Sequence, residues 1–319
     1  MDSMVFLKNL FDLFRYRWLT ELNDCQLQVR AQSNRLLYLE LMNFADNRFC
    51  EELDFLRTIG RAEIFPYPTV RKLETVEIGR EGKWGYPYVS HHGKRLYFPK
   101  TWTPARMEDT YRIFVEKENI TAKSVGDNEG YILKMPHKYQ GGCVYVKEGD
   151  IIVDVGAAEG LFALDVVERV SRIVLFENDP QWFGPLEHTF APWADKTFLV
   201  RKTVGDRDTR HSIRLASALH DLPGDRFFVK MDIEGAEVPV VSASRDFLSW
   251  DKDIRLACCT YHNAGDAEIL ERLFRETGYF TEFSDGWMLP TARRLSPPYF
   301  RKGVIRAWRK HSGQDKTIP

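Results

Sequence analysis

The segment 151–160 constrains the fold of this chain more than any other, because an apolar run leads there into a turn with glycine at both ends. It reads IIVDVGAAEG, and a second apolar run follows at 161–170. A strand that is apolar at nearly every position is typical of a parallel sheet covered by helices on both faces. Glycine allows the turn positive φ angles and close backbone contacts. We therefore predict a strand, a turn and a helix, the opening unit of an α/β fold.

The rest of the second half repeats this rhythm of apolar strands and helices, which is the pattern of a βαβ sheet. Asp179 followed by Pro180 is a good helix start, with a capping residue before a proline at the first helical position. The last part of the chain, 278–290 and 301–309, predicts two more strands. We expect one domain over 150–319, with strands at Ile151–Val155, Arg172–Glu177, Thr197–Val204, Phe227–Met231 and Ile254–Tyr261, and helices at Leu161–Val170, Pro180–Trp193, Ala236–Leu248 and Asp266–Gly278.

Composition excludes some function classes. The 319 residues carry a net charge of −1, so no overall charge recruits nucleic acid or an acidic surface, and we expect no nucleic-acid partner. The five cysteines are scattered and form no CxxC pair, so we predict reduced thiols rather than disulfides or a zinc site. Charged residues interrupt the apolar N-terminus, so we expect neither a signal peptide nor a stable membrane insertion, and we expect a cytoplasmic protein.

The turn at 156–160 favours one kind of nucleotide ligand over another. Its glycines are four positions apart and do not form the GxGxxG pattern of dinucleotide sites. Asp154 and Glu159 place carboxylates there, which would repel a pyrophosphate and attract a cationic sulfonium with a free amino group. The loop therefore favours S-adenosylmethionine over a nicotinamide dinucleotide.

Two further strand ends carry acidic groups. Glu177 ends the second strand, where an acid can accept hydrogen bonds from ribose hydroxyls. The fourth strand runs into FFVKMDIEGAE at 227–237, with Lys230, Asp232, Glu234 and Glu237 at its end. Glu234 and Glu237 can equally be acids that favour a helix N-terminus. Asp232, at the tip of the strand, is expected to face the cofactor.

The fifth strand ends in CCTYHNAGD at 258–266, and its His262 lies on the same edge of the sheet. A neutral imidazole can take an alcohol proton, so we predict His262 as the general base, ahead of Asp232, with His137 as a third candidate. Capping of the following helix is the alternative role. Asp232, Glu234 and Glu237 offer oxygen ligands suited to magnesium, but we predict no metal, because the turn at Gly235 makes a shared face doubtful.

Together these elements resemble the FkbM family of methyltransferases, within the class I Rossmann-like superfamily. The likeness covers about residues 85–310. Its most specific pieces are VDVGAAEG at 153–160 and VKMDIEGAE at 229–237, and PHKY at 136–139 and Tyr261-His262 also look like family features. The first 70 residues match no family that we can name.

The resemblance implies a seven-stranded sheet, closed at one edge by a late antiparallel hairpin, and O-methylation, frequently of sugars, glycans or polyketide-type products. It also implies roles for individual residues. Asp154, Gly156 and Gly160 would hold the methionine part of S-adenosylmethionine within a loop that includes Ala157 and Glu159, Glu177 would hold the ribose, Asp206 would lie near adenine, and Asp232 would lie near the transferred methyl group.

The segment 69–149 has a different pattern from the second half of the chain. Short β-rich pieces at 75–78, 86–90 and 95–98 are separated by glycine and proline, and Gly93-Lys94 after His91-His92 predicts a hairpin turn. The segment is dense in aromatic residues, which can wall an acceptor pocket or form an ordinary packing layer. These residues are Trp84, Tyr86, Tyr88, Tyr97, Phe98 and Trp102.

Residues 1–68 predict a helical region. One apolar stripe recurs at helical spacing in Leu7, Leu10, Phe11, Phe14, Trp18 and Leu22, and a second run from about Asn34 to Leu56 ends at Gly60. The stripe can pack on the protein's own core, join two copies of the chain in a homodimer, or lie on a membrane surface with Lys8, Arg15 and Arg17 beside it.

The sequence therefore predicts a methyltransferase that acts on a hydroxyl of a small molecule or glycan. The acceptor oxygen would displace the sulfonium in line, so the protein mainly aligns the atoms and removes a proton. Two alternatives stay open: a nicotinamide-dependent oxidoreductase on a similar sheet, and a binding module that keeps the fold without catalysis.

Overall fold

The computed structural model describes residues 32–44, 46–68, 73, 75–82, 85–118, 134–290 and 297–309. The chain divides into two compact units. One comprises Met1–Tyr67 with Leu289–Phe300, and the other comprises Pro68–Met288 with Arg301–Pro319. The apolar stripe from Leu7 to Leu22 lies outside the described residues. None of the described helices is long and apolar enough to cross a membrane.

The described residues of the first unit include helices at 32–42 and 47–59, so the run predicted from Asn34 to Leu56 is broken. A helix over 32–42 ends before Asp46, which caps the short 3-10 helix η1 (Asn47–Phe49). Helix α2 (Cys50–Ile59) follows and ends at Gly60 with a φ of 69°, which confirms the predicted stop. The late segment of the chain joins this unit, since Phe49 stacks on Phe300 with ring centroids 4.7 Å apart.

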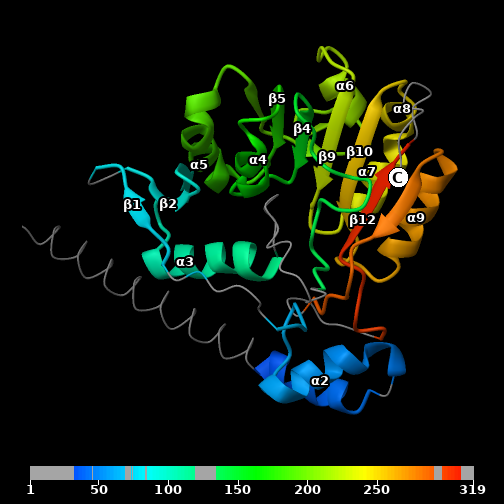
Figure 1. Ribbon diagram of the computed structural model, residues 1–319. Coiled ribbons are helices and arrows are strands. Elements are labelled where there is room, and N and C mark those ends of the chain that lie inside the picture. Colours follow the sequence, from blue (N-terminus) through cyan, green and yellow to red (C-terminus); the bar gives the residue numbers. More distant parts are fainter. Residues whose placement is uncertain are drawn as a thin grey trace, which may run out of the picture. The chain divides into compact units, whose positions relative to one another are not determined.

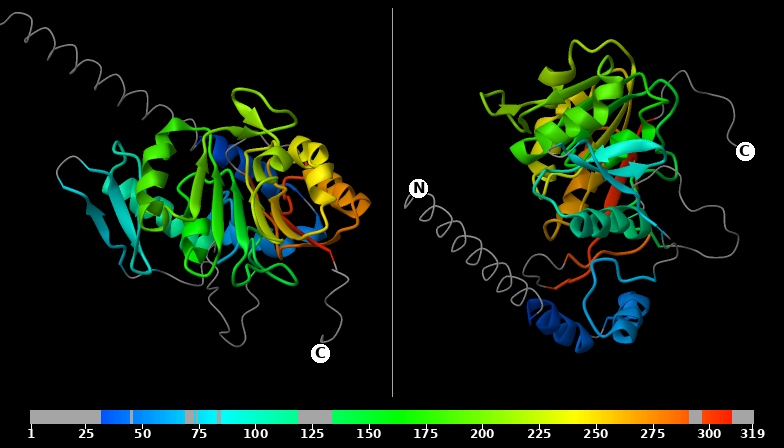
Figure 2. Two further views of the ribbon diagram at one scale, coloured as in Figure 1. Left: turned by 90° about the horizontal axis from the view of Figure 1, so that it is seen from above. Right: turned by 90° about the vertical axis from the view of Figure 1, so that its left-hand side faces the viewer.

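The second unit is built on a seven-stranded sheet, so the predicted Rossmann-like α/β fold is confirmed (Figure 1). Its strands follow the order β11-β12-β10-β9-β4-β5-β6. The five from β10 to β6 are parallel, and β12 pairs antiparallel with both β10 and β11. The bounds are β4 Ile151–Val155, β5 Arg172–Phe176, β6 Thr197–Val200, β9 Arg226–Met231, β10 Asp253–Cys259, β11 Phe280–Phe283 and β12 Val304–Trp308. Figure 2 shows the same order by colour, from the green strands to the red and orange hairpin.

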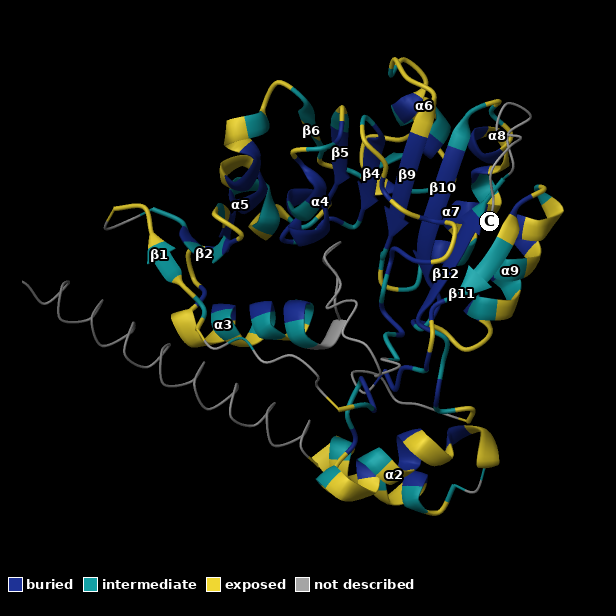
Figure 3. Ribbon diagram, viewed as in Figure 1, coloured by how far each residue is buried: buried dark blue, intermediate teal, exposed yellow. Residues whose placement is uncertain are grey.

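Helices cover both faces of this sheet, which is why its central strands are apolar at consecutive positions. Alternate residues of β4 enter different cores: Ile152 joins one apolar cluster, while Ile151 and Val153 join the other. Helices α4 (Leu161–Val166) and α5 (Pro180–Phe190) pack in the first cluster. Helices α6 (Leu215–Leu219), α7 (Glu237–Ala243), α8 (Arg245–Leu248) and α9 (Asp266–Glu276) pack in the second. Figure 3 shows β4, β9 and β10 buried along nearly their whole length.

The segment 69–149 is less uniformly β-rich than predicted. Strands β1 (Ile78–Arg80), β2 (Pro87–His91) and β3 (Lys94–Tyr97) form a three-stranded antiparallel sheet, with the predicted hairpin turn between the last two. Helix α3 (Pro104–Arg112) then follows, which the sequence analysis missed. The signal was present, because the Thr103 side chain caps the helix and Pro104 opens it.

The third predicted strand, Thr197–Val204, is wrong in its second half. The chain leaves the main sheet after Val200, and β7 (Thr203–Val204) instead pairs with β8 (Ser212–Ile213) in a separate parallel ribbon. Helix α6 follows this ribbon and was also missed, because its five residues are too few to show a helical period.

A buried ion pair joins Arg255, near the amino end of β10, to Asp150, the residue directly before β4. Arg255 of β10 is 2% exposed, and its guanidinium lies 2.7 Å from Asp150, which is fully buried. Arg255 also donates to the carbonyl of Tyr145 and to Asp253. Removing one partner of such a pair leaves a buried charge without compensation.

We expect Arg255→Leu to lower the free energy of unfolding by about 3–5 kcal/mol, since Asp150 would stay buried without its main partner. Denaturant titration measures the change. The matched control is Arg245→Leu, because Arg245 forms a 2.7 Å pair with Glu276 in which both side chains are about half exposed; that change should cost at most about 1 kcal/mol. A loss for Arg255→Leu no larger than the control's would contradict this account.

Candidate functional site

A cavity of about 610 Å³ opens at the carboxyl ends of β4, β5 and β9, where parallel sheets of this type place their ligands. Backbone and side chains of the glycine turn form one wall, and aromatic rings form much of the remainder. Lining residues named by the sequence analysis are Asp154, Gly156, Ala157, Glu159, Glu177, Asp232, Glu234, Lys230 and His137, and the aromatic ones are Phe114, Tyr139, Phe162, Phe176, Trp182 and Tyr261.

The turn owes its shape to contacts with the protein itself. Gly156 has a φ of 80°, and a Cβ there would overlap the carbonyl oxygen of Asp232. Ala158 also has positive φ, at 47°. Gly160 does not line the cavity. It caps α4 with a φ of 81°, and a side chain there would press on Leu186.

Lys230 and Asp154 form a buried pair under the turn. They face each other in the register of β9 and β4, with the Lys230 Nζ 3.0 Å from Asp154 Oδ1. The same Nζ donates to the carbonyl of Gly156 at 2.6 Å. Burial disfavours the lysine charge, but Asp154 and Asp232 outweigh it and raise the pKa of Lys230. The Oδ2 of Asp154 is buried without a hydrogen-bond partner among the described residues.

Glu177 holds the turn from the next strand. Its Oε2 accepts a hydrogen bond from the Ala158 amide at 2.8 Å, and its Oε1 accepts from the amides of Asn178 and Asp179, both at 2.8 Å. A carboxylate offers about four lone-pair positions. Three are therefore used by the backbone, which leaves room for about one further donor rather than the two ribose hydroxyls that the sequence analysis expected.

Asp232 is the centre of a polar cluster at the cavity wall. Tyr139 donates its hydroxyl to Asp232 Oδ2 at 2.9 Å, and the Nε2 of His137 lies 3.5 Å from the same oxygen. The Tyr139 hydroxyl and the Cys259 thiol also lie within 3.4 Å of the His137 Nε2. Burial opposes the charge of Asp232, but the bond to His137 and the charges of His137, Lys230 and His262 hold its pKa well below the usual range.

His262 does come next to Asp232, as the adjacent strand ends predicted, with Nε2 3.5 Å from Asp232 Oδ1. It does not line the cavity. It is 4% exposed, and its Nδ1 lies 2.9 Å from Glu237, which is fully buried. Burial disfavours the imidazolium, but Glu237 and Asp232 together raise the pKa of His262. A buried ring held between two carboxylates and away from the cavity lining is poorly placed for the predicted role of base.

Asp206 is not brought to the cavity. It lies exposed beyond β7, where it pairs with Arg207 at 3.0 Å. The reason is the break after Val200, which carries the chain into the β7–β8 ribbon, so that Lys202, Thr203 and Val204 line the cavity instead. The sequence analysis gave no role to Tyr139 or Trp182. Tyr139 belongs to the sequence pattern PHKY at 136–139, which was named above as a family feature.

The charges that line the cavity are mainly negative. Six carboxylic residues line it, namely Asp154, Glu159, Glu177, Asp179, Asp232 and Glu234, against the two lysines Lys202 and Lys230. Asp154 already compensates Lys230. The field in the cavity therefore favours a cationic ligand over a phosphorylated one.

No family model and no curated protein matches the sequence. Solved structures do resemble it. A precorrin-6Y C5,15-methyltransferase from Geobacter metallireducens is 19% identical, with 52% of this chain and 84% of that one covered and a TM-score of 0.35. The METTL16 methyltransferase domain is 15% identical, with 50% and 59% covered and a TM-score of 0.36. Trm5b from Pyrococcus abyssi is 12% identical, with 73% and 62% covered and a TM-score of 0.34.

The raised pKa of His262 predicts a pH dependence of stability. A group whose pKa is raised on folding stabilises the folded state fully below its unfolded pKa, about 6.5, and loses that contribution as pH rises through the folded pKa. Between pH 6 and pH 9 the wild type should therefore lose more unfolding free energy than His262→Gln, by about 1.4 kcal/mol for each unit by which the pKa is raised. The control is His220→Gln, because His220 is 78% exposed. Parallel curves for the wild type and His262→Gln would contradict the raised pKa of His262.

Proposed function

We propose that this chain is an S-adenosylmethionine-dependent methyltransferase of class I that acts on a hydroxyl group of a sugar, glycan or other natural product. The observation that carries the proposal is the acid-lined cavity beside the glycine turn, at the carboxyl ends of β4, β5 and β9. The resemblance of 153–160 and 229–237 to the FkbM family supports the same reading and makes that family our proposal for its membership.

The residues around the turn fit the methionine part of the cofactor. The ligand carries an ammonium and a sulfonium, both positive, and the buried Oδ2 of Asp154 still has the capacity to accept a hydrogen bond. Glu159 lies on the same wall. The attraction between a carboxylate and such a charge is stronger within a protein than in water, because the local dielectric constant is lower.

Glu177 fits the nucleoside part of the cofactor. Three backbone amides donate to its carboxylate, and one ribose hydroxyl would donate to the lone pair that remains. The ring of Phe176 and the stretch 202–204 line the cavity beside it. When bound, S-adenosylmethionine supplies a methyl group on a positive sulfur, which a hydroxyl oxygen can take while the C–S electron pair stays on sulfur.

The acceptor hydroxyl must lose its proton during transfer, and we assign that proton to His137. His137 lines the cavity, whereas His262 does not. Asp232 holds the ring through Nε2 and stabilises its protonated form. Asp232 itself is a weak base, because its pKa is so low. Tyr139 positions Asp232, and the rings of Tyr261 and Phe114 offer flat surfaces to a sugar-sized acceptor.

The negative charge of the cavity disfavours binding of a nicotinamide dinucleotide. A pyrophosphate beside the turn would meet Asp154, Glu159 and Glu177, with Lys202 as the uncompensated lysine of the lining. A decisive test is to incubate the protein with methyl-labelled S-adenosylmethionine and fractions of glycans and metabolites from a cell extract. A labelled product supports the proposal. Binding of S-adenosylhomocysteine without any transfer would support the binding module instead.

We expect Glu177→Gln to weaken binding of S-adenosylhomocysteine by roughly 1.5–3 kcal/mol, because the charged acceptor for the ribose hydroxyl is lost. Isothermal calorimetry measures the affinity. Glu187→Gln is the matched control, since Glu187 lies on α5, is about half exposed and pairs with Arg201. An affinity for Glu177→Gln equal to that of the control would exclude the ribose assignment.

We expect His137→Gln to lower turnover of the identified acceptor by about 10²–10⁴-fold, the usual worth of general-base assistance, and to leave affinity for S-adenosylhomocysteine nearly intact. His262→Gln should reduce turnover less, because it acts behind Asp232. The assignment fails if His137→Gln retains turnover within about threefold of the parent, or if His262→Gln shows the larger loss.

A further inference from the structure

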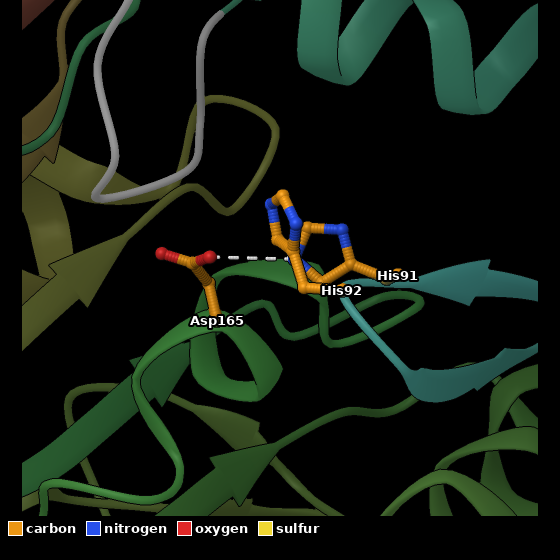
Figure 4. Close-up of side chains that lie close together, drawn as sticks. All are labelled: His91, His92 and Asp165. Atoms are coloured by element: carbon orange, nitrogen blue, oxygen red, sulfur yellow. Dashed lines mark hydrogen bonds and ion pairs between the residues drawn. The ribbon is translucent and has the colours of Figure 1, made fainter.

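A second group of ionisable side chains lies away from the cavity lining, where the β2–β3 hairpin meets α4. It comprises His91, the last residue of β2, His92 in the hairpin turn, and Asp165 of α4 (Figure 4). One donor atom from each of the three side chains lies within 4.8 Å of the other two. The sequence analysis used His91-His92 only to locate the turn and predicted no metal site.

His91 is held so that its Nε2 points at Asp165. The ring is fully buried, and its Nδ1 shares a 2.8 Å hydrogen bond with the hydroxyl of Tyr111 on α3. Its Nε2 lies 3.3 Å from Asp165 Oδ1, the contact drawn in Figure 4. Histidines that bind metals almost always have their second ring nitrogen fixed by such a hydrogen bond, which sets the tautomer and the ring orientation.

His92 adds a third donor through an unusual backbone. Its φ is 50°, a left-handed conformation that few residues other than glycine adopt. The His92 ring lies beside that of His91, with centroids 4.4 Å apart, although neighbouring residues of a strand point to opposite faces. The hydrogen bond between His91 and Asp165 involves only these two side chains. A metal ion needs further ligands, and His92 offers one.

We propose that His91, His92 and Asp165 bind a divalent transition-metal ion of the zinc type, with water as a fourth ligand. Two imidazoles and one carboxylate are an established donor set for zinc. Ligands at 2.0–2.2 Å in a tetrahedron are about 3.3–3.6 Å apart, and the His91–Asp165 distance of 3.3 Å lies at the lower end of this range. The ion replaces the proton that the hydrogen bond otherwise holds between these two atoms.

The ion would fasten the hairpin to the helix that follows the glycine turn. His91 and His92 belong to the three-stranded sheet, while Asp165 belongs to α4, which starts directly after Gly160. Such an ion would stabilise the folded state, because it would bind the folded chain in preference to the unfolded one.

Zinc titration of the chelator-treated protein tests the site. We expect one zinc ion per chain by calorimetry, with affinity weakened at least about tenfold in His92→Asn and in Asp165→Asn, since each removes a ligand. Asparagine keeps the fold at both positions, because it tolerates positive φ and matches aspartate in shape. Zinc should also raise the melting temperature of the wild type and not that of these variants.

Two controls separate this site from others among the described residues. His220→Asn removes a histidine from an exposed His–Asp pair, and Asp232→Asn disrupts both remaining groups of metal-ligating side chains, one with His137 and Cys259, the other with Glu237 and His262. Both variants should bind zinc as the wild type does. Tight binding that persists in His92→Asn or Asp165→Asn, or that is lost in either control, overturns the proposal.

Cobalt provides a readout on the unaltered chain. Cobalt bound by two imidazoles and a carboxylate absorbs in the visible range without a thiolate charge-transfer band. Such a spectrum supports the site, and a thiolate band would overturn it by indicating the group that contains Cys259.

Discussion

The buried contact between Lys230 and Asp154 is the interaction on which the site depends most. The two residues face each other across β9 and β4, and the ammonium also holds the carbonyl of Gly156, so one charge fixes two strands and the turn between strand and helix. Taking both charges out of water is costly, and only the short contacts offset that cost. The backbone of Gly156 lies directly against that of Asp232, so the glycine turn and the end of β9 meet at this point.

Four carboxylates around this point, three of them buried, differ in what they contact, and the contacts separate their roles. Asp154 meets a lysine, Glu177 binds backbone amides, Asp232 meets Tyr139 and His137, and Glu237 meets His262. Residues of one chemical type thus take different tasks because each has a different neighbour. An acid enclosed away from the cavity lining, such as Glu237, serves the structure, and one that lines the cavity and keeps unused acceptor capacity, such as Asp154, can meet a ligand.

Local patterns were reliable for several elements defined by burial on both faces or by a cap, although the capped helix α3 was missed. The strand 151–155, the start of α5 at Asp179-Pro180 and the stop at Gly60 are found where the sequence predicts them. Prediction failed where a short element depends on pairing with a distant one. The end of β6 at Val200 is such a place, because the residues after it could continue the main sheet or join β8, and their own composition does not decide between the two.

The sequence by itself determined the strand–turn–helix unit, the alternation that builds the sheet, and the acids at the tips of β4, β5 and β9, because each is a matter of neighbouring residues and a fixed period. Only the tertiary structure decided which histidine lines the cavity. His137 and His262 both approach Asp232, but one ring lies on the cavity side and the other is enclosed against Glu237. That difference comes from tertiary packing, which brings residues 137, 232 and 262 together, and no spacing within the chain encodes it.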